Sequence, residues 1–176
     1  GKWEKKAYGK GIELQGKTLG IVGFGRIGQH LGVMAKAIGM KVIAFDIYQV
    51  PVISEQLGIP YVEMDELLAQ SDFISVHAPA VDGGALISAE NIAKMKDGVV
   101  VINTSRGTNV DEAALLAALE SGKVRAAGLD VYADEPASNV ALYSHPMVSC
   151  TPHIGAATVE AQKRIGQEIV EIIAAM

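Results

Sequence analysis

Three short segments each hold one residue that could take part in acid–base chemistry, and each follows an apolar run typical of a strand. Arg106, Glu135 and His153 occur in the stretches 103–107, 130–136 and 151–155. Oxidising a 2-hydroxy acid requires a cation for the carboxylate, a base for the hydroxyl proton and a carboxylate that orients that base. Because ligands bind at the carboxyl ends of strands in open α/β sheets, we predict that these three residues form such a catalytic set.

Each member of this set also has a structural interpretation when it is taken alone. Arg106 could be a solvated loop residue, Glu135 a turn residue before a proline, and His153 a hydrogen-bonded core histidine. Their joint occurrence after strand-like runs favours the catalytic interpretation. His77 also ends a strand-like run, and we interpret it as structural or site-lining. The Asp65-Glu66 pair and its counterpart at 134–135 match no metal-ligand spacing, so we predict no metal.

A glycine motif of the form G-x-G-x-x-G follows the apolar run 19–22 and opens a helical pattern. The motif alone is weak evidence, because glycine-rich turns are common. In this context Gly23 permits the turn, Gly25 lets the backbone approach a pyrophosphate, and Gly28 lets the helix pack on the strand. The helix N-terminus adds N–H donors and a favourable dipole, so the motif predicts a dinucleotide site.

Asp46 closes the apolar run 42–45, where such sites place the acidic residue that binds the adenosine ribose. A carboxylate at this position repels a 2′-phosphate, and the next residues, Ile47 and Tyr48, supply no cation to hold one. The pattern therefore predicts NAD as the cofactor in preference to NADP. The alternative is that Asp46 only ends a strand.

Strand-like and helical patterns alternate along the chain, which predicts the framework that positions these residues. The run 99–102 is apolar at every position, as expected for a parallel sheet covered on both sides. We therefore predict one α/β domain over 1–176: a doubly wound, mostly parallel, Rossmann-type sheet with helices on both faces. The predicted strands are 18–22, 41–46, 73–76, 99–103, 126–130 and 147–149, and the predicted helices are 26–38, 52–57, 64–70, 89–95, 111–120 and 160–176.

Composition limits the classes of protein to which the chain can belong. Its 176 residues are 49% apolar and 20% charged with a formal net charge of −5, which excludes disorder and argues against nucleic acid or an anionic membrane as partners. No apolar run approaches the roughly 18 residues of a membrane span. One cysteine excludes an internal disulfide and suits a reducing compartment, so we expect a soluble, cytoplasmic protein.

Several motifs in one order resemble the NAD-binding domain of the D-isomer-specific 2-hydroxyacid dehydrogenases. The matching segments are 1–3, 13–28, 76–79, 103–107, 130–136 and 151–158, and the last of these with 160–162 is most similar to the phosphoglycerate dehydrogenases. The resemblance implies that His153 is the acid/base, Glu135 its partner and Arg106 the substrate anchor. The implied cofactor contacts are Gly23, Gly25, Arg26, Ile27, Gly28, Asp46, Ala78, Thr104, Ser105, Arg106, Asp130, His153, Gly155 and Ala156.

The resemblance also implies oxidation of 3-phosphoglycerate to 3-phosphohydroxypyruvate by NAD, at the entry to serine synthesis. The alternatives are another D-2-hydroxy acid, such as glycerate, glyoxylate or lactate, or a non-catalytic NAD-sensing module like the transcriptional corepressors of this fold. Members of the family carry a separate substrate domain, so we expect a segment cut from a two-domain enzyme that binds NAD with little or no turnover. A homodimer through this domain is implied. Exposed Trp3 and Tyr8 near the start of the chain would fit a docking arm, and the alternative is that they belong to a frayed terminus. The glycine-rich loop 80–87 departs from the family's threonine-containing pattern.

Overall fold

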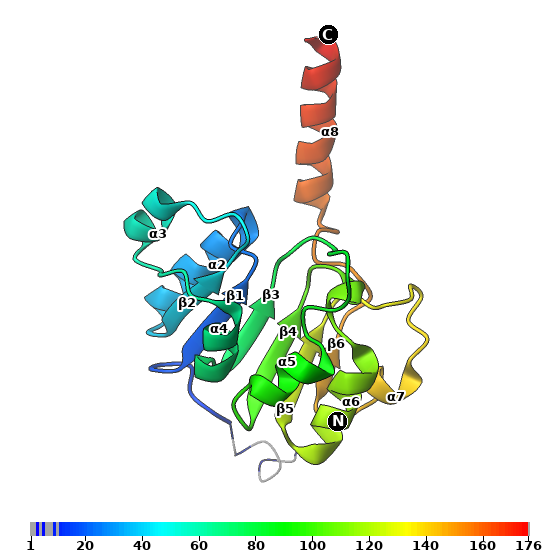
Figure 1. Ribbon diagram of the computed structural model, residues 1–176. Helices are drawn as coiled ribbons and strands as arrows, with labels where there is room; N and C mark the ends of the chain where they lie inside the picture. Colours follow the sequence, from blue (N-terminus) through cyan, green and yellow to red (C-terminus); the bar gives the residue numbers. More distant parts are fainter. Residues whose placement is uncertain (1–2, 4, 6–8, 10, 176) are drawn as a thin grey trace.

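The computed structural model describes residues 3, 5, 9 and 11–175, and a six-stranded sheet runs through its centre (Figure 1). All neighbouring strands are parallel, in the order β2-β1-β3-β4-β5-β6. The doubly wound fold predicted from the sequence is thus confirmed, with a sheet that is parallel throughout. The strands are β1 (Thr18–Val22), β2 (Lys41–Phe45), β3 (Phe73–Val76), β4 (Val99–Asn103), β5 (Val124–Leu129) and β6 (Val148–Cys150).

The longer helices begin and end within two residues of their predicted limits. The helices are α2 (Arg26–Ala37), α3 (Pro51–Leu57), α4 (Met64–Gln70), α5 (Ala89–Lys94), α6 (Glu112–Ser121), α7 (Val140–Tyr143) and α8 (Val159–Ala174), with a 3-10 turn η1 (Gly107–Asn109). Local signals explain several ends: Asp111 accepts a hydrogen bond from the N–H of Ala114 at the start of α6, and Gly122 ends α6 in the left-handed conformation. The sequence did not predict α7 and η1, because each is too short to show a helical period.

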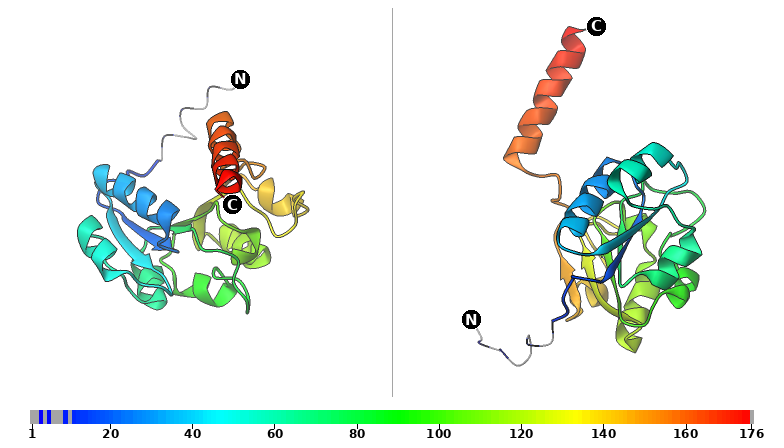
Figure 2. Two further views of the ribbon diagram at one scale, coloured as in Figure 1. Left: turned by 90° about the horizontal axis from the view of Figure 1, so that it is seen from above. Right: turned by 90° about the vertical axis from the view of Figure 1, so that its left-hand side faces the viewer.

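Helices lie on both faces of the sheet (Figure 2), and each face carries a hydrophobic core. One contains Ile21, Ala44 and Ile59, and α2 contacts β1 and β2 on this side. The other contains Val101 and Leu115 and is covered by α4, α5 and α6. Because the side chains of a strand alternate between faces, the apolar runs of β1 and β3 contribute to both cores.

On the face of the sheet that α2 covers, the side chains of β4 are only partly buried. Val99 and Val101 are buried, whereas Val100 and Ile102, which alternate with them, are only half-buried. The run predicted to be covered on both faces is therefore fully covered on one face only within the described part of the chain.

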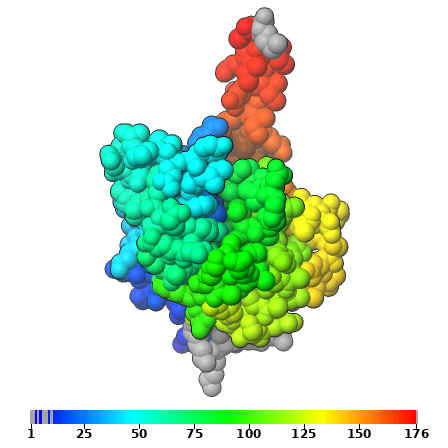
Figure 3. Space-filling view, viewed as in Figure 1, coloured from blue at the N-terminus to red at the C-terminus, as the bar shows by residue number. Residues whose placement is uncertain are grey.

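The last helix, α8, projects away from the sheet (Figures 1 and 3). None of its described residues is buried, and its exposed apolar side chains include Val159, Ile165 and Ile169. Trp3 is 93% exposed, which does not distinguish a docking arm from a frayed terminus, and Tyr8 lies outside the described residues. Among the described helices, none is both long and apolar enough to cross a membrane.

Candidate active site

The glycine turn follows β1, at the point where the order of strands reverses between β1 and β3. Gly23 has φ of +94°, and a Cβ built on it would lie 2.6 Å from the backbone nitrogen of Ala78. A Cβ on Gly28 would lie 2.4 Å from the carbonyl oxygen of Gly23. These two glycines are therefore needed so that the turn can pack against the neighbouring backbone.

Gly25 serves a different purpose, because a Cβ built on it would have no atom within 4 Å. It is the N-cap of α2, and no side chain caps this end of the helix, so the first N–H groups of α2 remain available to a ligand. A hollow of about 490 Å³ lies here, lined by Gly25, Arg26, Ile27 and His77. Open space in front of uncapped N–H groups fits the pyrophosphate of a dinucleotide.

Asp46 lies directly after β2, where the sequence placed the ribose-binding carboxylate. Its Oδ2 accepts a hydrogen bond from the N–H of Phe24 at 2.6 Å, and its Oδ1 accepts one from the N–H of Tyr48 at 2.9 Å. Phe24 lies inside the glycine motif. Asp46 therefore braces the turn as well as presenting acceptor oxygens beside it, a second role that the motif did not predict.

The glycines offer a matched pair of substitutions. Gly28→Ala is expected to lower the melting temperature clearly, because its methyl group would overlap the backbone of Gly23. Gly25→Ala is expected to leave the melting temperature unchanged and to raise the Kd for NAD on the order of tenfold, because its methyl group would stand between the phosphate and the helix N–H groups. Thermal unfolding and calorimetric titration with NAD measure the two effects. Unchanged NAD affinity in Gly25→Ala would contradict this placement of the cofactor.

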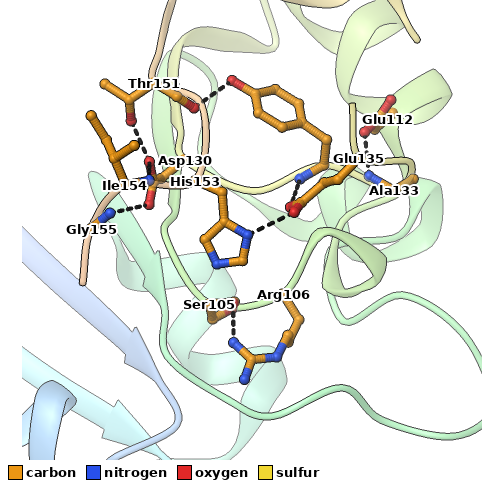
Figure 4. A network of polar contacts seen from close by, with 11 residues as sticks. Ser105, Arg106, Glu112, Asp130, Ala133, Glu135, Thr151, His153, Ile154 and Gly155 are labelled. Atoms are coloured by element: carbon orange, nitrogen blue, oxygen red, sulfur yellow. Dashed lines mark hydrogen bonds and ion pairs between the residues drawn. The ribbon is translucent and has the colours of Figure 1, made fainter. Parts of the chain in front are cut away.

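The side chains of His153 and Glu135 form a hydrogen-bonded pair near the ends of β5 and β6 (Figure 4). Nδ1 of His153 lies 2.7 Å from Oε2 of Glu135, and Oε1 of Glu135 accepts a 3.3 Å hydrogen bond from the N–H of Tyr132. The hydrogen bond with His153, with a smaller contribution from that N–H, lowers the pKa of Glu135, so this carboxyl is ionised at neutral pH. Since Glu135 engages Nδ1, Nε2 is the nitrogen left to react.

His153 has an unusual backbone conformation, with φ of +53°. Non-glycine residues at positive φ are uncommon and occur preferentially at functional sites, where their surroundings hold them. Here the buried side chain of Asp130 stabilises this backbone conformation. Its Oδ1 accepts hydrogen bonds from the hydroxyl of Thr151 at 2.5 Å and from the N–H of Ile154 at 2.9 Å. Its Oδ2 accepts a 2.9 Å hydrogen bond from the N–H of Gly155. Asp130 therefore fixes the turn that carries the histidine.

This arrangement predicts a pH-dependent stability. Burial acts to raise the pKa of Asp130, but its three hydrogen bonds outweigh burial and the pKa lies below the usual value. In the unfolded chain the pKa of this carboxyl is about 3.9. The stability that ionised Asp130 contributes is therefore complete above that pH and is lost as the pH falls through the lower pKa of the folded state. Asp130→Asn should therefore lower the melting temperature at about pH 6, and its difference from wild type should narrow towards about pH 3. A difference that stays constant with pH would contradict this account.

Arg106 lies on the side of the imidazole away from Glu135 (Figure 4). Its guanidinium Nη1 donates to the carbonyl oxygen of Ser105 at 2.7 Å, and the rest of the group is exposed. Asn103, the last residue of β4, holds the loop: its Oδ1 accepts from the N–H and hydroxyl of Ser105, and its Nδ2 donates to the carbonyl oxygen of Arg106. The cation and the imidazole thus lie on loops that follow β4 and β6, at the same edge of the sheet.

Residues that the sequence analysis did not single out hold these loops in place. Asn109 donates through Nδ2 to the carbonyl oxygen of Ala78 at 2.9 Å and to the hydroxyl of Ser105 at 3.2 Å. Glu112, the first residue of α6, accepts a 2.8 Å hydrogen bond from the N–H of Ala133 in the loop that carries Glu135. In the sequence, only their proximity to Arg106 could have indicated that Asn109 and Glu112 support the site. Asn109 and Glu112 thus join the loops of β3, β4 and β5.

Tyr132 also holds two loops of the site together. Burial, together with the neighbouring Cys150, raises the pKa of Tyr132 to about 12, so the phenol stays protonated. Its hydroxyl donates to the carbonyl oxygen of Thr151 at 3.0 Å, which ties the loop after β5 to the loop of His153.

The predicted site residues therefore fall into two groups at one edge of the sheet. The glycine turn, Arg26, Ile27 and Asp46 lie at the ends of β1 and β2, and the catalytic candidates lie at the ends of β4, β5 and β6. Ala78 lies between the groups and contacts both Gly23 and Asn109. Thr104, Gly155 and Ala156 are exposed near the catalytic candidates. Within the described residues, no three His, Cys, Asp or Glu side chains gather as metal ligands would.

Comparison with known protein families agrees with this geometry. Residues 1–155 match the model of the D-isomer specific 2-hydroxyacid dehydrogenase family, NAD binding domain. The chain belongs to this family. The matched range contains every predicted site residue except Ala156, and it establishes NAD as the cofactor of the domain.

Relatives within the 2-hydroxyacid dehydrogenases differ in their named substrates. A hydroxypyruvate reductase of Thermotoga maritima is 52% identical over 178 residues, covering 98% of this chain and 56% of the relative. A D-3-phosphoglycerate dehydrogenase of Mycobacterium leprae is 47% identical over 172 residues, covering 97% of this chain and 32% of the relative. The chain thus spans about half the length of these relatives or less.

A solved structure of the family shares both the fold and the cofactor. It is a D-lactate dehydrogenase of Aquifex aeolicus complexed with NAD and lactic acid, 37% identical, with a TM-score of 0.85. The match covers 93% of this chain and 54% of that one. This D-lactate dehydrogenase therefore has the same fold and holds NAD, while the names of the relatives indicate different substrates.

Proposed function

We propose that this chain is the nucleotide domain of a two-domain enzyme that interconverts a D-2-hydroxy acid and its 2-keto acid. The observation that carries the proposal is the 2.7 Å pair of His153 and Glu135, with the Arg106 guanidinium on the other side of the imidazole. A base, its orienting carboxylate and an exposed cation at the ligand edge of the sheet supply what this chemistry needs.

NAD, when bound, supplies the acceptor for the hydride of the hydroxy acid. The side chains of the protein bind the carboxylate of the substrate and transfer the proton of its hydroxyl group. Arg106 pairs with the substrate carboxylate through its guanidinium, which matches a carboxylate in shape and charge. Nε2 of His153 takes the hydroxyl proton during oxidation and returns it during reduction. The Glu135 carboxylate stabilises the imidazolium that forms and keeps the ring in one orientation.

For the substrate, we propose 3-phosphoglycerate, oxidised to 3-phosphohydroxypyruvate at the entry to serine synthesis. This choice is supported by the segments 151–158 and 160–162 and by the relative from Mycobacterium leprae. Hydroxypyruvate is the second candidate, because the reductase of Thermotoga maritima is 52% identical.

The test is a substrate screen on the longest natural protein that contains this chain. NADH oxidation would be followed with 3-phosphohydroxypyruvate, hydroxypyruvate, glyoxylate and pyruvate. Preference for the phosphorylated acid supports the first assignment, and preference for hydroxypyruvate supports the second. No turnover of any 2-keto acid, combined with NAD-dependent binding of a protein partner, would replace catalysis with a sensing role. The 176-residue chain itself is expected to bind NAD more tightly than NADP, with little or no turnover.

A further inference from the structure

The backbone of His77 lies beside the glycine turn. The N–H of His77 donates to the carbonyl oxygen of Val22 at 2.7 Å, which extends the pairing of β3 with β1 by one residue. A Cβ on Gly23 would lie 2.7 Å from the carbonyl carbon of His77. His77 also lines the hollow together with Gly25 and Arg26.

Alternation along β3 decides on which face the imidazole lies. Ile74 and Val76 belong to the core under α4, α5 and α6. Ser75 and His77 therefore share the opposite face, which α2 covers. The N-terminus of α2 and the imidazole of His77 are thus on one side of the sheet, at its ligand edge.

The neighbouring Ser75 determines which nitrogen of His77 carries the proton. Oγ of Ser75 lies 2.8 Å from Nε2 of His77, and this is the only described partner of that hydroxyl. Ser75 is 4% exposed, so a hydroxyl proton without an acceptor would be costly there. The hydroxyl therefore donates to Nε2, and the proton of the neutral ring resides on Nδ1.

Nδ1 is left free to bind a ligand. Within the described residues, Nδ1 has no hydrogen-bond partner. Among these residues, Oδ1 of Asn109 is the only side-chain polar atom that is both fully buried and without a partner. Nδ1 of His77 is therefore accessible. Burial lowers the pKa of His77, which keeps the ring neutral at pH 7 and Nε2 available to Ser75. The ring thus carries one accessible N–H donor, on a residue that lines the hollow.

We propose that His77 is a cofactor-binding residue whose Nδ1–H donates a hydrogen bond to the pyrophosphate of NAD at the turn of Gly25 and Arg26. The inference rests on the proposed placement of the pyrophosphate in front of the N-terminus of α2. Ser75 is then a positioning residue, because it does not contact the cofactor and only fixes the tautomer of His77. Nothing in the catalytic chemistry of His153 requires this contact.

Two substitutions separate the two ring nitrogens. The side-chain nitrogen of Asn can occupy the place of Nδ1, whereas the side-chain nitrogen of Gln can occupy the place of Nε2. His77→Asn is therefore expected to keep the Kd for NAD within about threefold of wild type, and His77→Gln to raise it about tenfold or more, the size expected for a hydrogen bond to a charged group. ADP-ribose, which keeps the pyrophosphate and lacks nicotinamide, should show the same contrast.

The experiment is calorimetric titration of this chain and its variants, after circular dichroism has shown that each is folded. Nitrogen-15 NMR adds a direct readout: wild-type His77 should be protonated at Nδ1, NAD should shift that signal, and Ser75→Ala should populate the other tautomer. If both His77 variants bind NAD as wild type does, or if Gln substitutes better than Asn, the inference is wrong.

Gly25→Ala separates this failure from a failure of the cofactor placement. If Gly25→Ala weakens NAD binding and neither His77 variant does, the pyrophosphate lies at the turn and only the role of His77 is wrong. If Gly25→Ala has no effect either, the placement itself fails and the inference fails with it.

Discussion

His153→Asn is expected to lower kcat about a thousandfold in the longest natural protein that contains this chain, within the range typical of a lost general acid–base group. Asparagine suits this test because it tolerates the positive φ of +53° at this position. Its side-chain nitrogen can keep the hydrogen bond to Glu135 that Nδ1 of His153 now makes. The substitution therefore removes little besides Nε2, the nitrogen assigned to move the proton.

Two measurements show whether the loss of kcat comes from the proton-transfer step or from weaker binding of NAD. Steady-state turnover of the preferred 2-keto acid gives kcat, and titration of the 176-residue chain gives the Kd for NAD, which should change far less than kcat. His145→Asn is the matched control, because this histidine lies after α7 and its Nδ1 only accepts a hydrogen bond from the N–H of Met147. A His153→Asn enzyme that keeps more than about a tenth of wild-type turnover would remove His153 from the acid–base role.

The fold could be predicted from the sequence because its signals are local. Apolar runs such as that of β4 alternate with helical periods, and Asp111 and Gly122 mark the ends of α6 by their own conformational preferences. The catalytic candidates could be predicted for a related reason. Each follows a strand, and parallel strands end at one edge of the sheet.

The supporting contacts could not be predicted, because they depend on which loops meet in three dimensions. Nothing local indicates that Asn109 reaches the carbonyl oxygen of Ala78, 31 residues earlier, or that Glu112 accepts from Ala133, 21 residues later. The second roles of Asp46 and Asp130 were missed for the same reason. The sequence indicated carboxylates near a ligand, and only the structure shows that both also bind backbone N–H groups of the turns beside them.

Asp46→Ala is expected to raise the Kd for NAD by about tenfold to a hundredfold, the loss expected when a charged acceptor of ribose hydroxyls is removed. The affinity for NADP should rise at the same time, because the substitution removes the negative charge that repels its 2′-phosphate. Asp65→Ala, on the exposed surface of α4, is the control and should change neither value.

The two roles of Asp46 can be separated with a second cofactor. Loss of the 2.6 Å hydrogen bond from Phe24 would loosen the turn and weaken every dinucleotide alike, whereas loss of a ribose contact depends on the ribose hydroxyl. Wild type should therefore bind NAD about tenfold more tightly than its adenosine 2′-deoxy analogue, while Asp46→Ala should bind both equally. If Asp46→Ala weakens both ligands by one common factor and keeps the wild-type preference for NAD, Asp46 only braces the turn. In that case the choice of NAD over NADP must come from other residues of the hollow.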